Sequence, residues 1–200
     1  MSFFNIREAK VEDIDEIVKL MLICFSDKFN VIFGSRIKKG KIALIEDLKT
    51  RKSLEDIIVA VCNEKIVGVF SLRFKETQYD FFSTLKIFIK HLGVINGVRS
   101  IFLGGFLPFS LSDDKCFIDY LGVLPEFRKQ GIGKDLITHG EKLAIEKNKK
   151  YIFCFINSSN IEPRQLVGKF GFKEKYVKTS ILSKVFFKEF DWIYLEKIIT

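Results

Sequence analysis

The sequence contains few of the residues that build metal sites or disulfide frameworks. It has two His residues, and its four cysteines, Cys24, Cys62, Cys116 and Cys154, are far apart with no Cys-x-x-Cys pair. Structural zinc sites need closely spaced Cys and His ligands, and disulfide scaffolds need many cysteines in a short chain. We therefore expect no metal, and we expect the cysteines to be reduced, mostly buried thiols in a cytoplasmic protein.

Long uncharged hydrophobic segments are also missing. Residues 1–10 lack a basic region followed by an apolar stretch and a small-residue cleavage site, so no secretory signal is expected. The longest uncharged apolar run, residues 100–112, contains Pro108. It is shorter than the about 20 residues that a spanning helix needs. No transmembrane segment is expected, and the predicted location is cytoplasmic.

Phenylalanine and positive charge are plentiful instead. The chain of 200 residues has 22 Phe and a formal net charge of +8. So much bulky apolar content argues against disorder. The charge would suit an anionic partner, and the densest cluster is Arg36, Lys38, Lys39 and Lys41. No motif of alternating aromatic and basic residues accompanies it, so we expect no nucleic-acid binding.

The apolar periodicity predicts strands and helices in alternation. Strands are expected at residues 3–9, 57–62, 66–74, 116–123, 151–156, 173–178 and 185–198. Helices are expected at residues 14–25, near 43–49, from 132 to 144, and over about eight residues from Ile161. Residues 63–65 join the second and third strands as a hairpin. The order predicts a single α/β (α+β) domain over residues 1–200, with one sheet flanked by helices.

A long segment, about residues 77–114, separates the third and fourth strands and contains six phenylalanines. Connections of this length in a compact domain carry function or secondary structure of their own. The spacing predicts a helix over residues 81–92, with Lys86 and Lys90 on one of its faces.

Residues 121–133 read Leu-Gly-Val-Leu-Pro-Glu-Phe-Arg-Lys-Gln-Gly-Ile-Gly and precede an amphipathic helix. A strand that leads through a glycine turn into a helix presents free backbone N–H groups and a positive dipole end, which suits a pyrophosphate. Gly131 and Gly133 allow close approach of an anion, and Arg128 and Lys134 add charge. The spacing fits neither the Walker-type loop nor the dinucleotide Gly-x-Gly-x-x-Gly pattern. A two-glycine turn is, by itself, also an ordinary connection.

This stretch resembles the GNAT superfamily of acyl-CoA-dependent N-acyltransferases. That family has an Arg/Gln-x-x-Gly-x-Gly/Ala loop, here residues 128–133, after a strand that ends LxVxP, here residues 121–125. The family motif NxxAxxLYxKxGF is matched within residues 160–172 at Asn160, Leu166, Lys169, Gly171 and Phe172. The resemblance covers nearly the whole chain. It implies a mixed, mostly antiparallel sheet of about seven strands, splayed between strands four and five, with the Phe-rich insertion between strands three and four.

The resemblance also implies acetyl-CoA as co-substrate and a set of residues that bind it. The backbone of Leu121 and Val123 would pair with the pantetheine arm as an added strand would. The loop would hold the pyrophosphate, and Asn160 would contact the pantetheine. The implied cofactor-binding residues are Leu121, Gly122, Val123, Arg128, Lys129, Gln130, Gly131, Ile132, Gly133, Lys134, Asn160 and Lys169.

The implied activity is N-acetyl transfer to an amine of a small molecule or peptide by direct attack, which needs a base, an oxyanion donor and an acid. The N–H of Val123 is the expected oxyanion donor. Asp119 is the expected base, although it can equally be a structural partner of a Lys or a backbone group while water removes the proton.

The sequence departs from the family at Val167, which occupies the position of the Tyr that usually acts as the general acid. Either Tyr120, Ser159 or water replaces that acid, or the domain is a regulatory or membrane-associated protein that binds CoA with weak catalysis. Three roles are open for the insertion. It forms a lid or wall of the acceptor pocket, it forms extra core or a homodimer interface, or it contacts a membrane through Lys86, Lys90 and Arg99.

Overall fold

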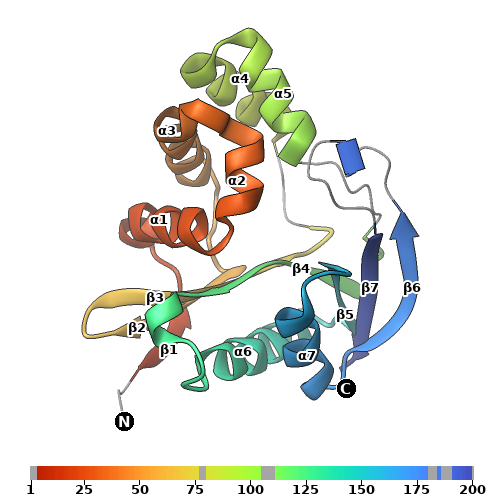
Figure 1. Cartoon of the computed structure of the whole chain (residues 1–200). Coiled ribbons are helices and arrows are strands. Elements are labelled where there is room, and N and C mark those ends of the chain that lie inside the picture. Colours follow the sequence, from red (N-terminus) through yellow and green to blue (C-terminus); the bar gives the residue numbers. More distant parts are fainter. Residues whose placement is uncertain (1–3, 77–79, 105–110, 180–183, 186–190, 200) are drawn as a thin grey trace. The chain divides into compact units, whose positions relative to one another are not determined.

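The computed structural model describes residues 4–76, 80–104, 111–179, 184–185 and 191–199 (Figure 1). The chain divides into two compact units. Residues 1–71, 78–105 and 120–140 belong to the first unit, and residues 72–77, 106–119 and 141–200 belong to the second. The expectation of a single domain over residues 1–200 stays a prediction.

The described residues include seven strands and seven longer α-helices. The strands are β1 (Asn5–Glu8), β2 (Ile57–Cys62), β3 (Lys65–Arg73), β4 (Lys115–Val123), β5 (Tyr151–Asn157), β6 (Lys173–Thr179) and β7 (Asp191–Ile198). The helices are α1 (Ile14–Cys24), α2 (Ser26–Phe33), α3 (Ile37–Lys49), α4 (Phe81–Leu92), α5 (Val94–Gly104), α6 (Ile132–Glu146) and α7 (Ile161–Lys169). Three short 3-10 turns precede α1, α3 and the loop before α6.

The strands form one mixed sheet in the order β1-β2-β3-β4-β5-β7-β6. β4 and β5 are parallel, while β1 with β2, β2 with β3, β5 with β7, and β6 with β7 are antiparallel. The described pairing of β4 with β5 covers Lys115–Phe117 and Tyr151–Phe153, three residues of each strand. The splay expected between strands four and five stays a prediction.

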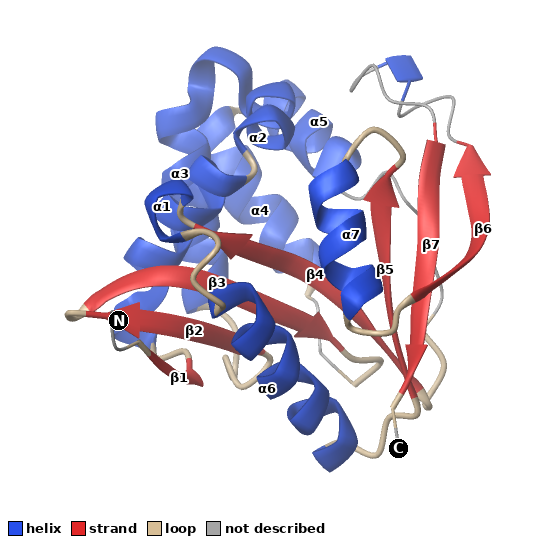
Figure 2. Cartoon of the chain, turned by 60° about the horizontal axis from the view of Figure 1, so that its bottom comes forward, coloured by secondary structure: helices blue, strands red, loops and turns tan. Residues whose placement is uncertain are grey.

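In the first unit, helices cover both faces of the β1–β3 strands. Figure 2 shows α6 on one face and α1 to α5 on the other. Residues 66–72 of β3 are all buried, as expected for a strand with both faces covered. Gly68 lies against Ile132 and Leu136 of α6, and a Cβ on Gly68 would be 3.0–3.1 Å from them. This packing fixes the helix whose N-terminus follows the candidate pyrophosphate loop.

The helices α4 and α5 form an antiparallel pair that packs on α3 and α2 in the first unit (Figure 1). The predicted helix at residues 81–92 is confirmed, with Asp80 accepting a hydrogen bond from the Ser83 N–H at its N-cap. Gly97 lets the two helices approach closely, because a Cβ there would lie 2.8 Å from the backbone of Ile89.

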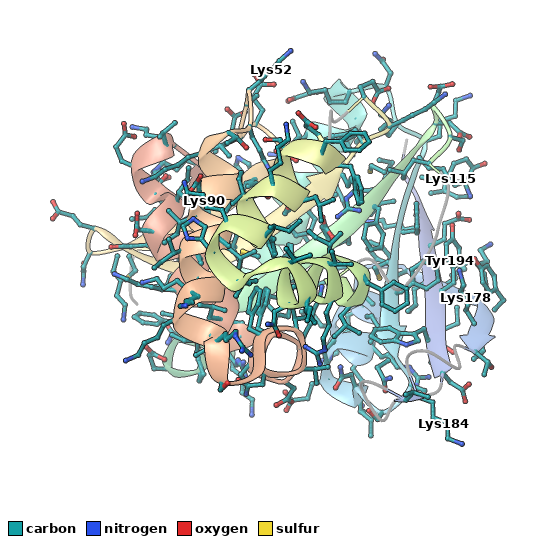
Figure 3. The ribbon with its side chains drawn as sticks, turned by 90° about the horizontal axis from the view of Figure 1, so that it is seen from above. Lys52, Lys90, Lys115, Lys178, Lys184 and Tyr194 are labelled. Atoms are coloured by element: carbon teal, nitrogen blue, oxygen red, sulfur yellow. The ribbon has the colours of Figure 1, made fainter. Side chains whose placement is uncertain are left out.

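In the second unit, β5, β7 and β6 present one face of aromatic side chains. The rings of Tyr176 and Tyr194 stack with centroids 4.6 Å apart, and Phe155 meets Tyr194 edge-on at 5.4 Å. Lys115 and Tyr194, both labelled in Figure 3, donate hydrogen bonds of 2.6 Å to Glu196. Burial, together with the hydrogen bond to Glu196, raises the pKa of Tyr194, so its hydroxyl stays protonated.

The structure corrects two expected elements and adds two helices that were not expected, α2 and α5. The short helix near residues 43–49 is the end of α3, which begins at Ile37, and α2 precedes it unpredicted. Of the last strand, expected at residues 185–198, the described part is β7 from Asp191; Val185 is helical, and residues 186–190 lie outside the described residues. Local apolar pattern predicted β structure at Val185, but the partner of a strand lies far along the chain and the pattern does not report it.

Candidate functional site

The candidate pyrophosphate loop joins β4 to α6 in the first unit. Its residues Arg128, Lys129, Gln130 and Gly131 are exposed. Lys129 and Gly131 have positive φ angles of 60° and 89°, so the chain turns tightly there. A Cβ on Gly131 would meet no heavy atom within 4 Å, which leaves open space on that side of the backbone.

The N-terminus of α6 faces this turn. Its hydrogen-bond ladder begins with the N–H of Asp135, which donates to the carbonyl of Gly131 at 3.1 Å. The N–H groups of Ile132, Gly133 and Lys134 precede that bond. They have no partner within the helix, because the first N–H groups of an α-helix have no carbonyl one turn earlier. Helix dipole, free donors and an exposed Lys134 together suit an anionic group. The side chain of Ile132 is buried, so this residue can serve a ligand only through its backbone.

Arg128 has a structural role that its motif position does not reveal. Its Nε donates to the carbonyl of Val123 at 3.1 Å, which ties the loop to the end of β4. The N–H of Leu124 in turn donates to the carbonyl of Val67 on β3 at 2.9 Å. Both bonds hold the strand end that carries the expected oxyanion donor.

Gly122 and Tyr120 lie against the end of α1 and the start of α2. A Cβ on Gly122 would lie 3.0 Å from Cβ and 3.2 Å from Sγ of Cys24, so the strand and helix are in close contact. The Tyr120 ring meets Phe25 edge-on at 5.3 Å, and Lys28 Nζ lies 5.0 Å from its centroid. Tyr120 is half-buried, and its ring is held from two sides.

Asp119 is paired with a cation in the second unit. Its Oδ2 accepts hydrogen bonds from Nε and Nη2 of Arg73 at 3.1 and 2.5 Å. The Asp119 side chain is 15% exposed and that of Arg73 is 43% exposed. Asp119 therefore has a structural partner, and this partner is Arg73, whereas a Lys or a backbone group was expected. A base at Asp119 would have to accept a proton beside this guanidinium.

The turn between β5 and α7, also in the second unit, contains a residue that the sequence analysis missed. Asn157 is 3% exposed, and its Oδ1 accepts hydrogen bonds from the N–H and the hydroxyl of Ser159 at 2.8 and 2.6 Å. Its Nδ2 has no hydrogen-bond partner. A buried unpaired amide costs about 1–3 kcal/mol, so such a donor calls for an acceptor. Its position three residues before the motif Asn160 was the available signal.

The remaining motif residues lie on α7. Asn160 precedes the helix as its N-cap residue, and both Asn160 and Lys169 are exposed. The Asn160 side chain makes no capping hydrogen bond, so it is not committed to the helix end. Val167 is 2% exposed and packs in the core. The position of the family Tyr is thus filled by a buried apolar side chain, and the hydroxyl of Ser159 is occupied by Asn157.

Three of the four cysteines are buried, and Cys24 is half-buried. All four are free, and burial raises the pKa of Cys116 and of Cys154 to about 12. Burial also raises the pKa of Cys24, against a lowering by Arg128. Thiols held protonated in this way are poor nucleophiles. Within the described ranges, no cluster of three metal-ligating side chains occurs, and no helix has the length and apolar character to cross a membrane.

Comparison with solved structures shows the same fold in several acetyltransferases. One acetyltransferase is 20% identical with a TM-score of 0.72, and the match covers 98% of this chain and 100% of the other. The PaiA N-acetyltransferase of Thermoplasma acidophilum, solved with coenzyme A, is 16% identical with a TM-score of 0.62 and coverage of 98% and 99%. An N-acetyltransferase of Staphylococcus aureus Mu50 is 17% identical with a TM-score of 0.61, and both chains are fully covered.

No curated protein sequence matches the chain significantly. The model of the Acetyltransferase (GNAT) family, however, matches residues 16–172, well over half of the chain. This span contains the loop of residues 128–134 and the motif of residues 160–172. The chain belongs to the GNAT family and is an acetyl-CoA-dependent acetyltransferase.

Proposed function

We propose that the protein transfers an acetyl group from acetyl-CoA to an amine of a small molecule or peptide, by direct attack in a ternary complex. The loop between β4 and α6 is the observation that carries this proposal. It combines exposed cations, a glycine with open space beside its backbone, and the N-terminus of a 15-residue helix. The free thiols fit action in the reducing cytoplasm.

In this proposal, the loop binds the pyrophosphate of acetyl-CoA. The N–H groups of residues 129–134 donate to its oxygens, with Lys129 and Lys134 supplying charge. Arg128 acts mainly on the protein, because its Nε is engaged by the Val123 carbonyl. Leu121 and Val123 provide backbone groups for the pantetheine arm. Asn160 and Lys169 remain cofactor-binding residues on the strength of the family motif.

For the chemical step, we assign the N–H of Val123 to the oxygen that becomes negative as the amine attacks the thioester. Asp119 accepts the amine proton directly or through water, and Tyr120 is the acid for the departing thiolate. The buried Val167 has no proton to give, so the acid must come from another group or from water.

We further assign the unpaired Nδ2 of Asn157 to a carbonyl oxygen of bound acetyl-CoA. Asn157→Asp keeps an acceptor for Ser159 but replaces this donor. The loss of one donor predicts an about ten-fold weaker affinity for acetyl-CoA by calorimetry. Ser159→Ala is the control, since it removes the hydroxyl bond to Oδ1, keeps the bond from the backbone N–H, and leaves Nδ2 in place. Equal affinities of Asn157→Asp and the unaltered protein would contradict the assignment.

The cofactor site is tested by replacing Gly131 with Leu. The side chain would stand where the anion approaches, so acetyl-CoA should no longer raise the melting temperature. Gly34→Leu is a matched control, because Gly34 also has a positive φ (55°) and open space around its Cβ position. Both variants carry a similar backbone penalty, and only Gly131→Leu should lose the cofactor-induced shift. An undiminished shift in Gly131→Leu would exclude the loop as the pyrophosphate site.

Turnover is tested by release of free CoA thiol from acetyl-CoA across a panel of amines, polyamines and peptide N-termini. Turnover with any amine supports the transferase and names its substrate class. A clear acetyl-CoA shift in melting temperature with no turnover across the panel would instead favour a CoA-binding domain with weak catalysis, as the buried Val167 allows.

A further inference from the structure

The outer surface of α4 and α5 is apolar and exposed to solvent. Ile95 is 82% exposed, Phe82 is 71% exposed and Val94 is 65% exposed. We call this surface the α4–α5 face; its exposed apolar residues are Phe81, Phe82, Val94, Ile95, Val98 and Phe102. Soluble proteins rarely leave large apolar side chains clustered in this way unless the surface contacts a partner or a membrane.

The helical geometry gathers the exposed apolar side chains of α5 on one side of that helix. At 100° per residue, Val94, Val98, Phe102 and Ile95 of α5 fall within an arc of about 100°. The buried residues of α5, Gly97, Ser100 and Leu103, occupy the other side. Because Gly97 lies directly on the α4 backbone, α5 cannot rotate to bury its apolar arc without losing this contact. The exposure is therefore built into the packing of the pair.

The charge of the pair has one sign. Residues 81–104 contain Lys86, Lys90 and Arg99 and no Asp or Glu. Figure 3 looks onto α4 and α5, with Lys90 labelled on α4. Glu46 of α3 partly offsets this charge, since it accepts hydrogen bonds from Lys90 and His91. Arg99 donates to the backbone carbonyls of residues 31 and 32, which are neutral acceptors and do not offset its charge.

One residue of the basic cluster of the sequence, Arg36, contacts α5 directly. Arg36 Nη1 donates to Oδ1 of Asn96 at 3.3 Å, next to the most exposed apolar residue, Ile95. Lys38 and Lys39 follow on α3 and are exposed. The face thus combines apolar side chains with a border of cations, which is the composition of a helix that lies in a membrane interface.

We propose that the α4–α5 face lies on an anionic lipid bilayer as a surface contact. The apolar side chains enter the boundary between headgroups and acyl chains, and the cations meet lipid phosphates. A second copy of the chain fits less well, because a two-fold dimer through this face would set two helix pairs that carry only positive charges against each other. With α4 of 12 and α5 of 11 residues, the helices lie on the bilayer and do not cross it.

Co-sedimentation of the full chain tests this proposal. The vesicles contain phosphatidylglycerol and phosphatidylcholine, or phosphatidylcholine alone. We expect binding to the anionic vesicles and much weaker binding to the neutral ones. Added salt should weaken the anionic binding by screening. The double variant Phe82→Ser, Ile95→Ser should bind about 100-fold more weakly. The control Val11→Ser, Val177→Ser changes two comparably exposed apolar residues outside the face and should bind as before.

Three outcomes would overturn the proposal. The first is that the unaltered chain does not sediment with anionic vesicles. The second is that the two double variants bind these vesicles equally, and the third is that the chain binds neutral vesicles as well as anionic ones. Light scattering after gel filtration tests whether a second copy of the chain occupies the face instead. If the chain is a dimer that Phe82→Ser, Ile95→Ser dissociates, and it does not bind lipid, the face belongs to a dimer interface. Since the substitutions lie outside the cofactor loop, acetyl-CoA should still raise the melting temperature of every variant, which separates this test from that of the transferase.

Discussion

Two helical glycines predict opposite effects of the same substitution, and the difference tests the packing that supports the candidate pyrophosphate loop. Gly140 lies on α6, and a Cβ there would be 2.6 Å from Cζ of Phe70 and closer still to Cε1. Gly168 lies on α7, where a Cβ would meet no heavy atom within 4 Å. Alanine replaces each glycine, so the helix-propensity gain, up to about 1 kcal/mol, is similar at both positions.

The two sites differ in what the added methyl group displaces. Phe70 is 0% exposed, so its ring cannot move aside into solvent. Forcing a methyl group into such a core costs about 1–3 kcal/mol, and the rigid ring places the cost at the upper end. The net effect of Gly140→Ala is therefore a loss of about 2 kcal/mol, or about 4–8 °C in melting temperature for a chain of this size. Gly168→Ala should instead raise the melting temperature slightly.

Differential scanning calorimetry of the two variants measures this difference. A third variant, Phe70→Leu in the Gly140→Ala background, removes the ring that the methyl group meets and should recover part of the loss. The packing argument is refuted if Gly140→Ala stabilises the protein as much as Gly168→Ala does. In that case α6, which carries the loop at its N-terminus, would not be seated on β3 as closely as the structure shows.

Three further predictions concern charged and thiol groups. Asp119→Ala should lower kcat strongly while acetyl-CoA still raises the melting temperature, whereas Arg73→Ala should lower stability but retain most turnover; equal losses of turnover would make Asp119 a structural partner of Arg73 and not a base. Burial raises the pKa of Asp47, so the folded state loses stability as pH rises from the unfolded pKa of about 4 through the higher folded value. Asp47→Asn should thus raise the melting temperature at pH 7 and have little effect below pH about 4, and a stabilisation that persisted in acid would argue against this cause. Native Cys116 and Cys154, whose pKa values burial raises to about 12, should resist iodoacetamide at neutral pH and react after unfolding, as mass spectrometry would show.

The sequence by itself determined most elements and the turn that precedes α6. Apolar periodicity predicted α4 at its observed bounds and the β2–β3 hairpin, whose turn residues Asn63 and Glu64 both have positive φ. The spacing of Gly131 and Gly133 after β4 predicted the turn at the start of α6. These features depend on neighbours a few residues apart, so local pattern contains the information.

The tertiary structure alone decided which distant side chains meet. Asp119 pairs with Arg73, 46 positions away, and Asn157 is buried with an unpaired amide, although neither residue's neighbours in sequence indicate this. No helix was predicted over residues 94–104, and only the structure shows that packing of Gly97 on α4 turns the apolar side of α5 outward. Burial and pairing of this kind depend on how separate elements pack, and a linear pattern records only the spacing within each element.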